Sequence, residues 1–167
     1  MNVMVTLRSG SVDETRALAS ALAELARPGD LLLLVGDLGA GKTAFAQGFG
    51  QGLGIDERIT SPTFTLAREH RGGRLLLHHL DVYRLDQIAE VHDIGLPELL
   101  DEGGVTLIEW GDAIAPALPA DFLEVRLSFV DDDGEDDRTI ELRVVGPAWS
   151  ARGRALQRAV VPWVTEC

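Results

Sequence analysis

The chain has 167 residues, of which 46% are hydrophobic and 25% are charged, the proportions of an ordinary soluble globular domain. No apolar run approaches the about 20 residues that span a bilayer, and Met1 to Gly10 has none of the features of a secretory signal, so we expect one domain, residues 1–167, working in the cytoplasm. The net charge of −12 argues against direct docking on a nucleic-acid backbone, and the single cysteine, Cys167, excludes an internal disulfide.

The first part of the chain predicts a strand, a helix and a second strand. Val3 to Leu7 alternates weakly, as a short strand does, and Ser11 to Glu14 has the S-x-x-E form of a helix-capping box. The helix that begins there should end before Pro28-Gly29. Leu31 to Val35 is an unbroken apolar run between turn formers, which is typical of a central strand covered on both faces.

The rest of the chain predicts one more helix followed mainly by strands. A helix should run from Lys42 to about Leu53 and end at Gly54. The further expected elements are an antiparallel hairpin of Thr63 to Glu69 and Arg74 to Leu80, a broken helical stretch over Gln87 to Leu100, a strand over Val105 to Glu109, and a strand pair of Leu123 to Val130 and Thr139 to Val145. We expect residues 150–167 to be a peripheral tail with a short surface helix. These elements predict a three-layer α/β domain with a mixed central sheet.

The segment between the apolar strand and the second helix matches the phosphate-binding loop, or Walker A motif, G-x-x-x-x-G-K-[ST]. Its residues are Gly36, Asp37, Leu38, Gly39, Ala40, Gly41, Lys42 and Thr43. Glycines let successive backbone N–H groups point at phosphate oxygens, and the following helix adds the positive end of its dipole. Lys42, the only lysine in the chain, should reach the β- and γ-phosphates, while the Thr43 hydroxyl should bind a magnesium ion. The motif therefore predicts a P-loop nucleotide-binding domain.

Two acidic residues at predicted strand ends are candidates for the chemistry beside this loop. Asp81 closes an apolar run, where a Walker B aspartate would hold magnesium, although a turn aspartate would look the same. Glu109 closes a second strand and could bind magnesium through water or orient the attacking water; the alternative is an edge glutamate facing solvent. Thr63 could be a switch hydroxyl that senses the γ-phosphate. Trp110 could cover the nucleotide or pack at the edge of the core.

The histidines favour no metal site. We expect His70 and His92 at the surface, and His78 and His79 on opposite faces of one strand, where they cannot chelate an ion together.

Four segments, taken together in their order and spacing, resemble the TsaE (YjeE) family. They are residues 36 to 43, Ser61 to Phe64, His79 to Leu85 and Ile108 to Trp110. The resemblance covers nearly all of the chain up to about Val145. It implies the ATPase of the bacterial machinery that makes threonylcarbamoyladenosine beside the anticodon of tRNA. In that family the ATPase joins a heterodimer of TsaD and TsaB, hydrolyses ATP poorly alone, and is thought to reset the transferase, so tRNA would be reached only through the complex.

The resemblance also assigns roles to individual residues. Thr43 and Glu109 resemble the magnesium site, Asp81 the essential Walker B-like acid, Thr63 the switch threonine and Trp110 the tryptophan beside the nucleotide. Thr15, at the start of the first helix, resembles the adenine side. Two positions depart from the family pattern: Ala44 replaces a hydroxyl residue but keeps the backbone N–H that can bind phosphate, and Gln47 replaces an arginine.

Other functions remain compatible with the loop alone. A small-molecule P-loop kinase would share its size, lysine and strand-end acid, but it would usually carry an arginine-bearing lid, and residues 86–104 contain no arginine. A GTPase is less well supported, because the only lysine lies in the phosphate loop and the chain therefore has no N-K-x-D motif to recognise a guanine base. A nucleotide-gated assembly module would need only ATP occupancy to order the segment near Thr63.

Overall fold

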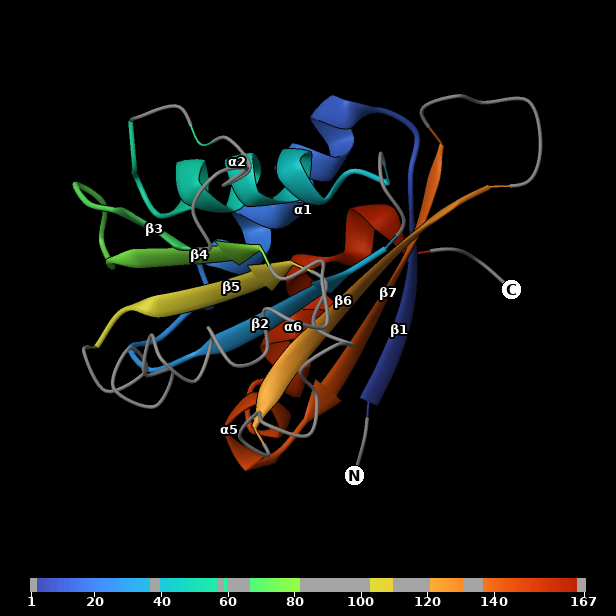
Figure 1. Ribbon diagram of the computed structural model, residues 1–167. Coiled ribbons are helices and arrows are strands. Elements are labelled where there is room, and N and C mark those ends of the chain that lie inside the picture. Colours follow the sequence, from blue (N-terminus) through green and yellow to red (C-terminus); the bar gives the residue numbers. More distant parts are fainter. Residues whose placement is uncertain are drawn as a thin grey trace, which may run out of the picture.

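The computed structural model describes residues 3–36, 40–56, 59, 67–81, 103–109, 121–130 and 137–164 (Figure 1). Its strands are β1 (Val3–Ser9), β2 (Leu31–Val35), β3 (Ala67–His70), β4 (Leu77–Asp81), β5 (Val105–Glu109), β6 (Phe122–Phe129) and β7 (Arg138–Val145). Its helices are α1 (Val12–Ala23), α2 (Lys42–Gly52), α5 (Pro147–Ser150) and α6 (Gly153–Ala159), followed by a 3-10 turn, η2 (Val161–Trp163). Among these described elements, no helix combines the length and the apolar character needed to cross a membrane.

All seven described strands form one sheet in the order β1-β7-β6-β2-β5-β4-β3. The centre is parallel, because β2 pairs in parallel with β5 and β6, and β5 with β4. Both ends are antiparallel, since β7 pairs with β1 and β6, and β3 with β4. Every residue of β2 is buried, so the centre of the sheet is covered on both faces. The predicted α/β class with a mixed central sheet is confirmed.

The described helices and alternate strand residues share one hydrophobic core. Leu32 and Leu34 of β2 belong to the same buried cluster as Phe45 of α2 and Leu18 of α1, and Leu156 of α6 belongs to it as well. Side chains alternate between the two faces of a strand, so these helices pack against one face of the sheet. Figure 1 shows α1 and α2 lying along each other there.

The start of α1 is capped as its sequence predicts. The Ser11 hydroxyl accepts a hydrogen bond from the backbone N–H of Glu14 at 3.1 Å, and the Glu14 carboxylate accepts one from the N–H of Gly10. The Ser11 bond satisfies one of the first amides that the helix itself leaves without a partner, and the Glu14 bond fixes the residue before the N-cap. The turn from β1 into α1 is thereby fixed.

Glycines allow α1 and α2 to approach closely. A Cβ atom on Gly48 would lie 2.2 Å from the carbonyl oxygen of Arg16, and one on Gly52 would lie 2.6 Å from that of Ser20. No side chain fits in either place, so the backbones of the two helices touch. This contact sets the position of α2, whose first turn carries Lys42.

The C-terminal segment contains the predicted helix, but it is not a peripheral tail. Trp149 and Leu156 are 1% and 0% exposed, and Arg152 is 5% exposed because its guanidinium binds the Asp30 carboxylate with N–O distances of 2.6 and 2.7 Å. The expectation of a surface helix is therefore wrong for the inner side of α6, although Arg154 and Arg158 are exposed. The partner that buries Arg152 is 122 residues away in the sequence, where no local pattern could reveal it.

The remaining predicted strands are present in the described residues, but the second strand of the hairpin begins at Leu77 and not at Arg74, since residues 74–76 belong to the turn. β3 and β4 form the expected antiparallel hairpin, and β6 and β7 form the expected strand pair. The broken helical stretch over residues 87–100 and the first part of the hairpin, residues 63–66, lie outside the described residues.

Candidate nucleotide site

The predicted phosphate loop lies at the carboxyl edge of the parallel strands. β2 ends at Val35 and α2 begins at Lys42, so the loop connects them directly. Glu109, the last residue of β5, is in register with Leu34 of β2 on one side and with Asp81, the last residue of β4, on the other. Crevices at this edge of a parallel sheet are where α/β domains bind ligands. The fold thus brings the loop and both strand-end acids to one edge.

The described glycines of the loop are required by its backbone path. A Cβ atom on Gly36 would lie 2.7 Å from the carbonyl oxygen of Leu127 on β6, so only glycine lets the chain leave β2 at this point. Gly41, which precedes α2, has a φ of +109°, a left-handed conformation that side chains disfavour. The Phe45 N–H then donates to the Gly41 carbonyl at 2.9 Å and closes the first helical turn.

The start of α2 has the properties of an anion site. Its N-cap residue, Gly41, provides no side chain to cap the helix, and the first turn contains no acidic residue. The first amides of a helix have no intrahelical acceptor and carry the positive end of its dipole. Lys42, Thr43 and Ala44 are half-buried there. The predicted nucleotide-binding residues Gly36, Ala40 and Gly41 to Ala44 are therefore brought together in the described part of the loop.

Arg138 supports the loop from a distant strand, and sequence reasoning missed it. Its Nε donates to the carbonyl oxygen of Ala40 at 3.1 Å, across a sequence separation of 98 residues. The guanidinium also lies 4.4 Å from the centre of the Phe129 ring, which holds it across the end of the β6–β7 pair. The residue follows an acidic run and has no local signal that would single it out.

Glu109 is buried, which removes the alternative of an edge glutamate facing solvent. Its side chain is 3% exposed, and its Oε2 lies 2.9 Å from Nε2 of His79, which is fully buried on β4. A carboxylate in such surroundings is stable only when it has hydrogen-bond or charge partners. Glu109 and the Thr43 hydroxyl are oxygen ligands of the kind that magnesium prefers, so the donor set at this edge fits that ion.

Thr15 lies at the junction of β1 and α1 and is 2% exposed. Its hydroxyl is 2.7 Å from that of Ser9, and its N–H donates to the carbonyl of Ser11. The Ser9 hydroxyl is thus a hydrogen-bond partner of the Thr15 hydroxyl within the protein. Of the other predicted site residues, Asp37, Leu38, Gly39, Thr63 and Trp110 lie outside the described residues, so their roles stay predictions.

The prediction that His70 lies at the surface is wrong. It is 2% exposed, and its ring centre is 6.4 Å from that of His79 on the neighbouring strand. His78 is buried too, with Nδ1 4.0 Å from a carboxylate oxygen of Glu69. His92 lies outside the described residues. Within the described ranges, no group of three histidine, cysteine or acidic residues could hold a metal by itself.

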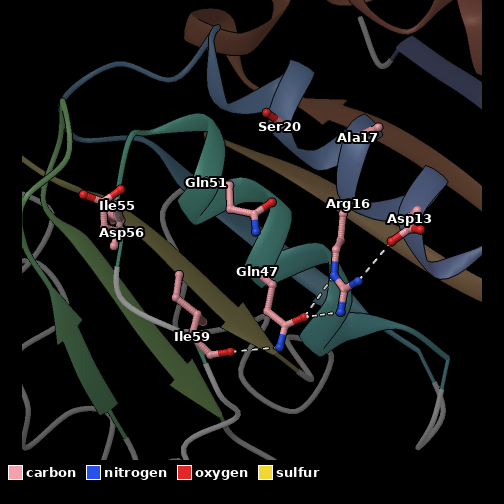
Figure 2. Close-up of a pocket in the computed structure, with 9 residues that line it drawn as sticks. All are labelled: Asp13, Arg16, Ala17, Ser20, Gln47, Gln51, Ile55, Asp56 and Ile59. Atoms are coloured by element: carbon pink, nitrogen blue, oxygen red, sulfur yellow. Dashed lines mark hydrogen bonds and ion pairs between the residues drawn. The ribbon is translucent and has the colours of Figure 1, made fainter.

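Gln47, one of the two departures from the expected pattern, connects three segments. Its Oε1 accepts hydrogen bonds from the Arg16 guanidinium at 2.9 and 3.2 Å, and its Nε2 donates to the carbonyl of Ile59 at 3.0 Å (Figure 2). A guanidinium is thus present beside position 47, but it comes from α1. A groove of about 640 Å³ surrounds this contact, and Figure 2 draws the side chains that line it. Its lining residues are Asp13, Arg16, Ala17, Ser20, Gln47, Gln51, Ile55, Asp56 and Ile59.

Comparisons with known proteins agree with this arrangement. The family model "Threonylcarbamoyl adenosine biosynthesis protein TsaE" matches residues 9–140. The chain is 42% identical over 151 residues to "tRNA threonylcarbamoyladenosine biosynthesis protein TsaE" of Bacillus subtilis, covering 90% of this chain and 92% of that one. It is 39% identical over 139 residues to the protein of the same name from Streptomyces coelicolor, covering 81% and 93%. Among solved structures, Bacillus subtilis YdiB superposes with a TM-score of 0.79 at 38% identity, covering 95% of this chain and 97% of that chain.

Proposed function

Because the chain belongs to the TsaE family, we propose that it is a cytoplasmic, magnesium-dependent ATPase required for threonylcarbamoyladenosine modification of tRNA beside the anticodon. The observation that carries this proposal is the loop between β2 and α2. At Gly36 the chain passes from the central strand into the loop so close to β6 that no side chain would fit. Gly41 is the N-cap of α2, whose first amides have no side-chain cap. That geometry suits a triphosphate, which is the ligand class of this loop type.

The side chains at this edge have separate tasks in the proposed reaction. Lys42 neutralises charge on the β- and γ-phosphates, while the backbone N–H groups from Gly36 to Ala44 surround the phosphate oxygens. Thr43, Glu109 and Asp81 would hold magnesium, which when bound spreads the negative charge that develops on the phosphates. Glu109 orients the attacking water, and Thr63 senses the γ-phosphate. In this proposal Trp110 lies beside the nucleotide and Thr15 lies on the side of the adenine.

Partner proteins complete the proposed activity. The family's pathway includes a TsaD–TsaB heterodimer that transfers the threonylcarbamoyl group, and we infer that ATP hydrolysis by this chain drives or resets that heterodimer. The net charge of −12 supports contact with tRNA only through the complex, because a strongly acidic surface repels a phosphate backbone. The one continuous sheet and the shared core of the described residues support a single domain over residues 1–167.

Hydrolysis measured with and without the purified TsaD–TsaB heterodimer tests the proposal. We expect slow release of phosphate by the chain alone and a clear stimulation by the heterodimer. Transfer of the γ-phosphate to a metabolite, with no stimulation, would identify a kinase instead. Full support of tRNA modification by a non-hydrolysable ATP analogue over many turnovers would identify an assembly module.

A further inference from the structure

Two adjacent parallel strands place a histidine against the acid that the proposed function uses. His79 is on β4 and Glu109 ends β5, and their Nε2 and Oε2 atoms are 2.9 Å apart. The two side chains are 0% and 3% exposed, so water does not compete for this bond. A carboxylate only accepts hydrogen bonds, so the imidazole donates from Nε2. The bond fixes one oxygen of Glu109 and with it the orientation of the carboxylate.

We propose that His79 is a positioning residue for Glu109 in ATP hydrolysis. A glutamate side chain has three rotatable torsions, and a carboxylate that must meet a water or a metal ion at one angle loses rate when those torsions are free. Groups that hydrogen-bond a metal-binding or catalytic side chain from behind typically contribute about 10–100-fold to affinity or activity. His79 supplies such a bond from inside the sheet. The inference rests on the proposed ATPase function and names one residue that supports it.

The surroundings of His79 favour this role over simple packing. Its other ring nitrogen, Nδ1, is buried and has no hydrogen-bond partner among the residues that the structure describes. The bond to Glu109 is therefore the one described polar contact of a fully buried ring. An apolar side chain would fill that space without leaving a polar atom unpaired, so packing alone does not explain a histidine here. The tilted ring of His70, 6.4 Å away, restricts how His79 can turn.

The matched substitutions His79→Gln and His79→Asn separate positioning from packing. The glutamine amide reaches the place of Nε2, whereas the shorter asparagine amide does not, and both replace a buried ring by a smaller polar group. In heterodimer-stimulated hydrolysis we expect His79→Asn to lower kcat by about 10–100-fold with KM changed by less than about threefold. His79→Gln should recover most of that loss. His78→Asn, at the buried position on the other face of β4, controls for damage to the strand.

A binding measurement provides a readout that does not depend on turnover. We expect titration calorimetry to give similar ATP dissociation constants for all variants in EDTA, which also reports that the loop is folded. Magnesium should strengthen ATP binding less in His79→Asn than in the wild type. In the wild-type protein labelled with ¹⁵N-histidine, addition of magnesium and ATP should shift the His79 ring signals more than those of His78.

Several results would overturn the inference. The first is a wild-type kcat for His79→Asn, and the second is an equal loss of kcat in His79→Asn and His79→Gln. The third is a His79 ring signal that does not shift when magnesium and ATP are added. The fourth is that His79→Asn lowers kcat by the same factor in the Glu109→Gln background as in the wild type. The proposed function fails in a different way. If the wild type shows no stimulated hydrolysis, the ATPase assignment falls. If Glu109→Gln hydrolyses ATP at the wild-type rate, the role of Glu109 falls, and that of His79 with it, while the ATPase assignment stands. If Glu109→Gln is impaired while His79→Asn is not, only the role of His79 falls.

Discussion

Arg152, the residue before α6, and Asp30, the residue before β2, form a buried bidentate ion pair. The N–O distances are 2.6 and 2.7 Å, and the two side chains are 5% and 7% exposed. Arg152 also donates to the carbonyl of Leu25 at 2.9 Å, and its guanidinium lies 3.9 Å from the centre of the Trp149 ring. This ion pair connects the start of α6 to the turn that precedes β2.

Replacing Arg152 by methionine should destabilise the fold. The substitution keeps the apolar stem but leaves the Asp30 carboxylate buried without its cation, a change that typically costs about 3–5 kcal/mol. The N–H of Arg27 still donates to Asp30 at 2.7 Å, so we expect the lower end of that range. Urea unfolding followed by circular dichroism measures the loss. Arg154→Met, on the exposed side of α6, should stay within about 0.5 kcal/mol of the wild type; equal midpoints for both variants would contradict the importance of the pair.

Gly48→Ala and Gly153→Ala should change stability in opposite directions. An added methyl at Gly48 meets the backbone of Arg16 at 2.2 Å and must push α1 and α2 apart, which costs about 1–3 kcal/mol. Nothing lies within 4 Å of the corresponding atom at Gly153, so alanine there should be neutral or stabilise α6 by up to about 1 kcal/mol. Thermal unfolding of both variants provides the comparison. A Gly48→Ala protein as stable as the wild type would mean that the two helices are not in backbone contact.

Lys42→Ala should abolish measurable ATP binding. The ammonium group is expected to contact two phosphates, and losing a charge-assisted contact of about 3 kcal/mol raises Kd about 100-fold. Titration calorimetry with magnesium and ATP measures the change. Arg71→Ala, in the exposed turn between β3 and β4, removes the same charge far from the loop and should bind normally. A Kd within threefold of the wild type for Lys42→Ala would remove this residue from the site.

Glu109→Ala should separate binding from turnover. The carboxylate is expected to act on the metal and the attacking water, so kcat should fall by about 100-fold or more while part of the ATP affinity remains. Phosphate release in the presence of the TsaD–TsaB heterodimer gives kcat, and calorimetry gives the affinity. Glu24→Ala, exposed after the end of α1, is the control for loss of one negative charge. Equal rates for wild type and Glu109→Ala would count against its catalytic role.

Local signals in the sequence were sufficient for most of the described fold. The run from Leu31 to Val35 is the observed β2 without any shift of its ends, because it is apolar throughout and bounded by turn formers. Ser11 caps α1 as its spacing to Glu14 predicts. The loop motif identified Gly36 and Gly41, whose backbone paths do require glycine.

Long-range contacts account for what sequence reasoning missed. Arg152 and His70 are polar residues, which usually lie at the surface. The burial of Arg152 depends on Asp30, 122 residues away, and His70 is buried on β3, where its ring lies 6.4 Å from that of His79. Arg138 reaches Ala40 only after β7 has joined the sheet beside β6. The bond between His79 and Glu109 likewise needs the parallel register of β4 and β5, which no single-strand pattern determines.

The position of β2 also has a consequence for synthesis on the ribosome. Both neighbours of this strand, β5 and β6, are translated after it, and the arginine that holds Ala40 is translated later still. When only the glycine-rich loop has left the ribosome, the strands β5 and β6 and the arginine that supports the loop have not yet been synthesised. We therefore do not expect such a nascent chain to bind ATP. We therefore expect competence for nucleotide binding to arise late, once β6 and β7 have left the exit tunnel and paired with the sheet.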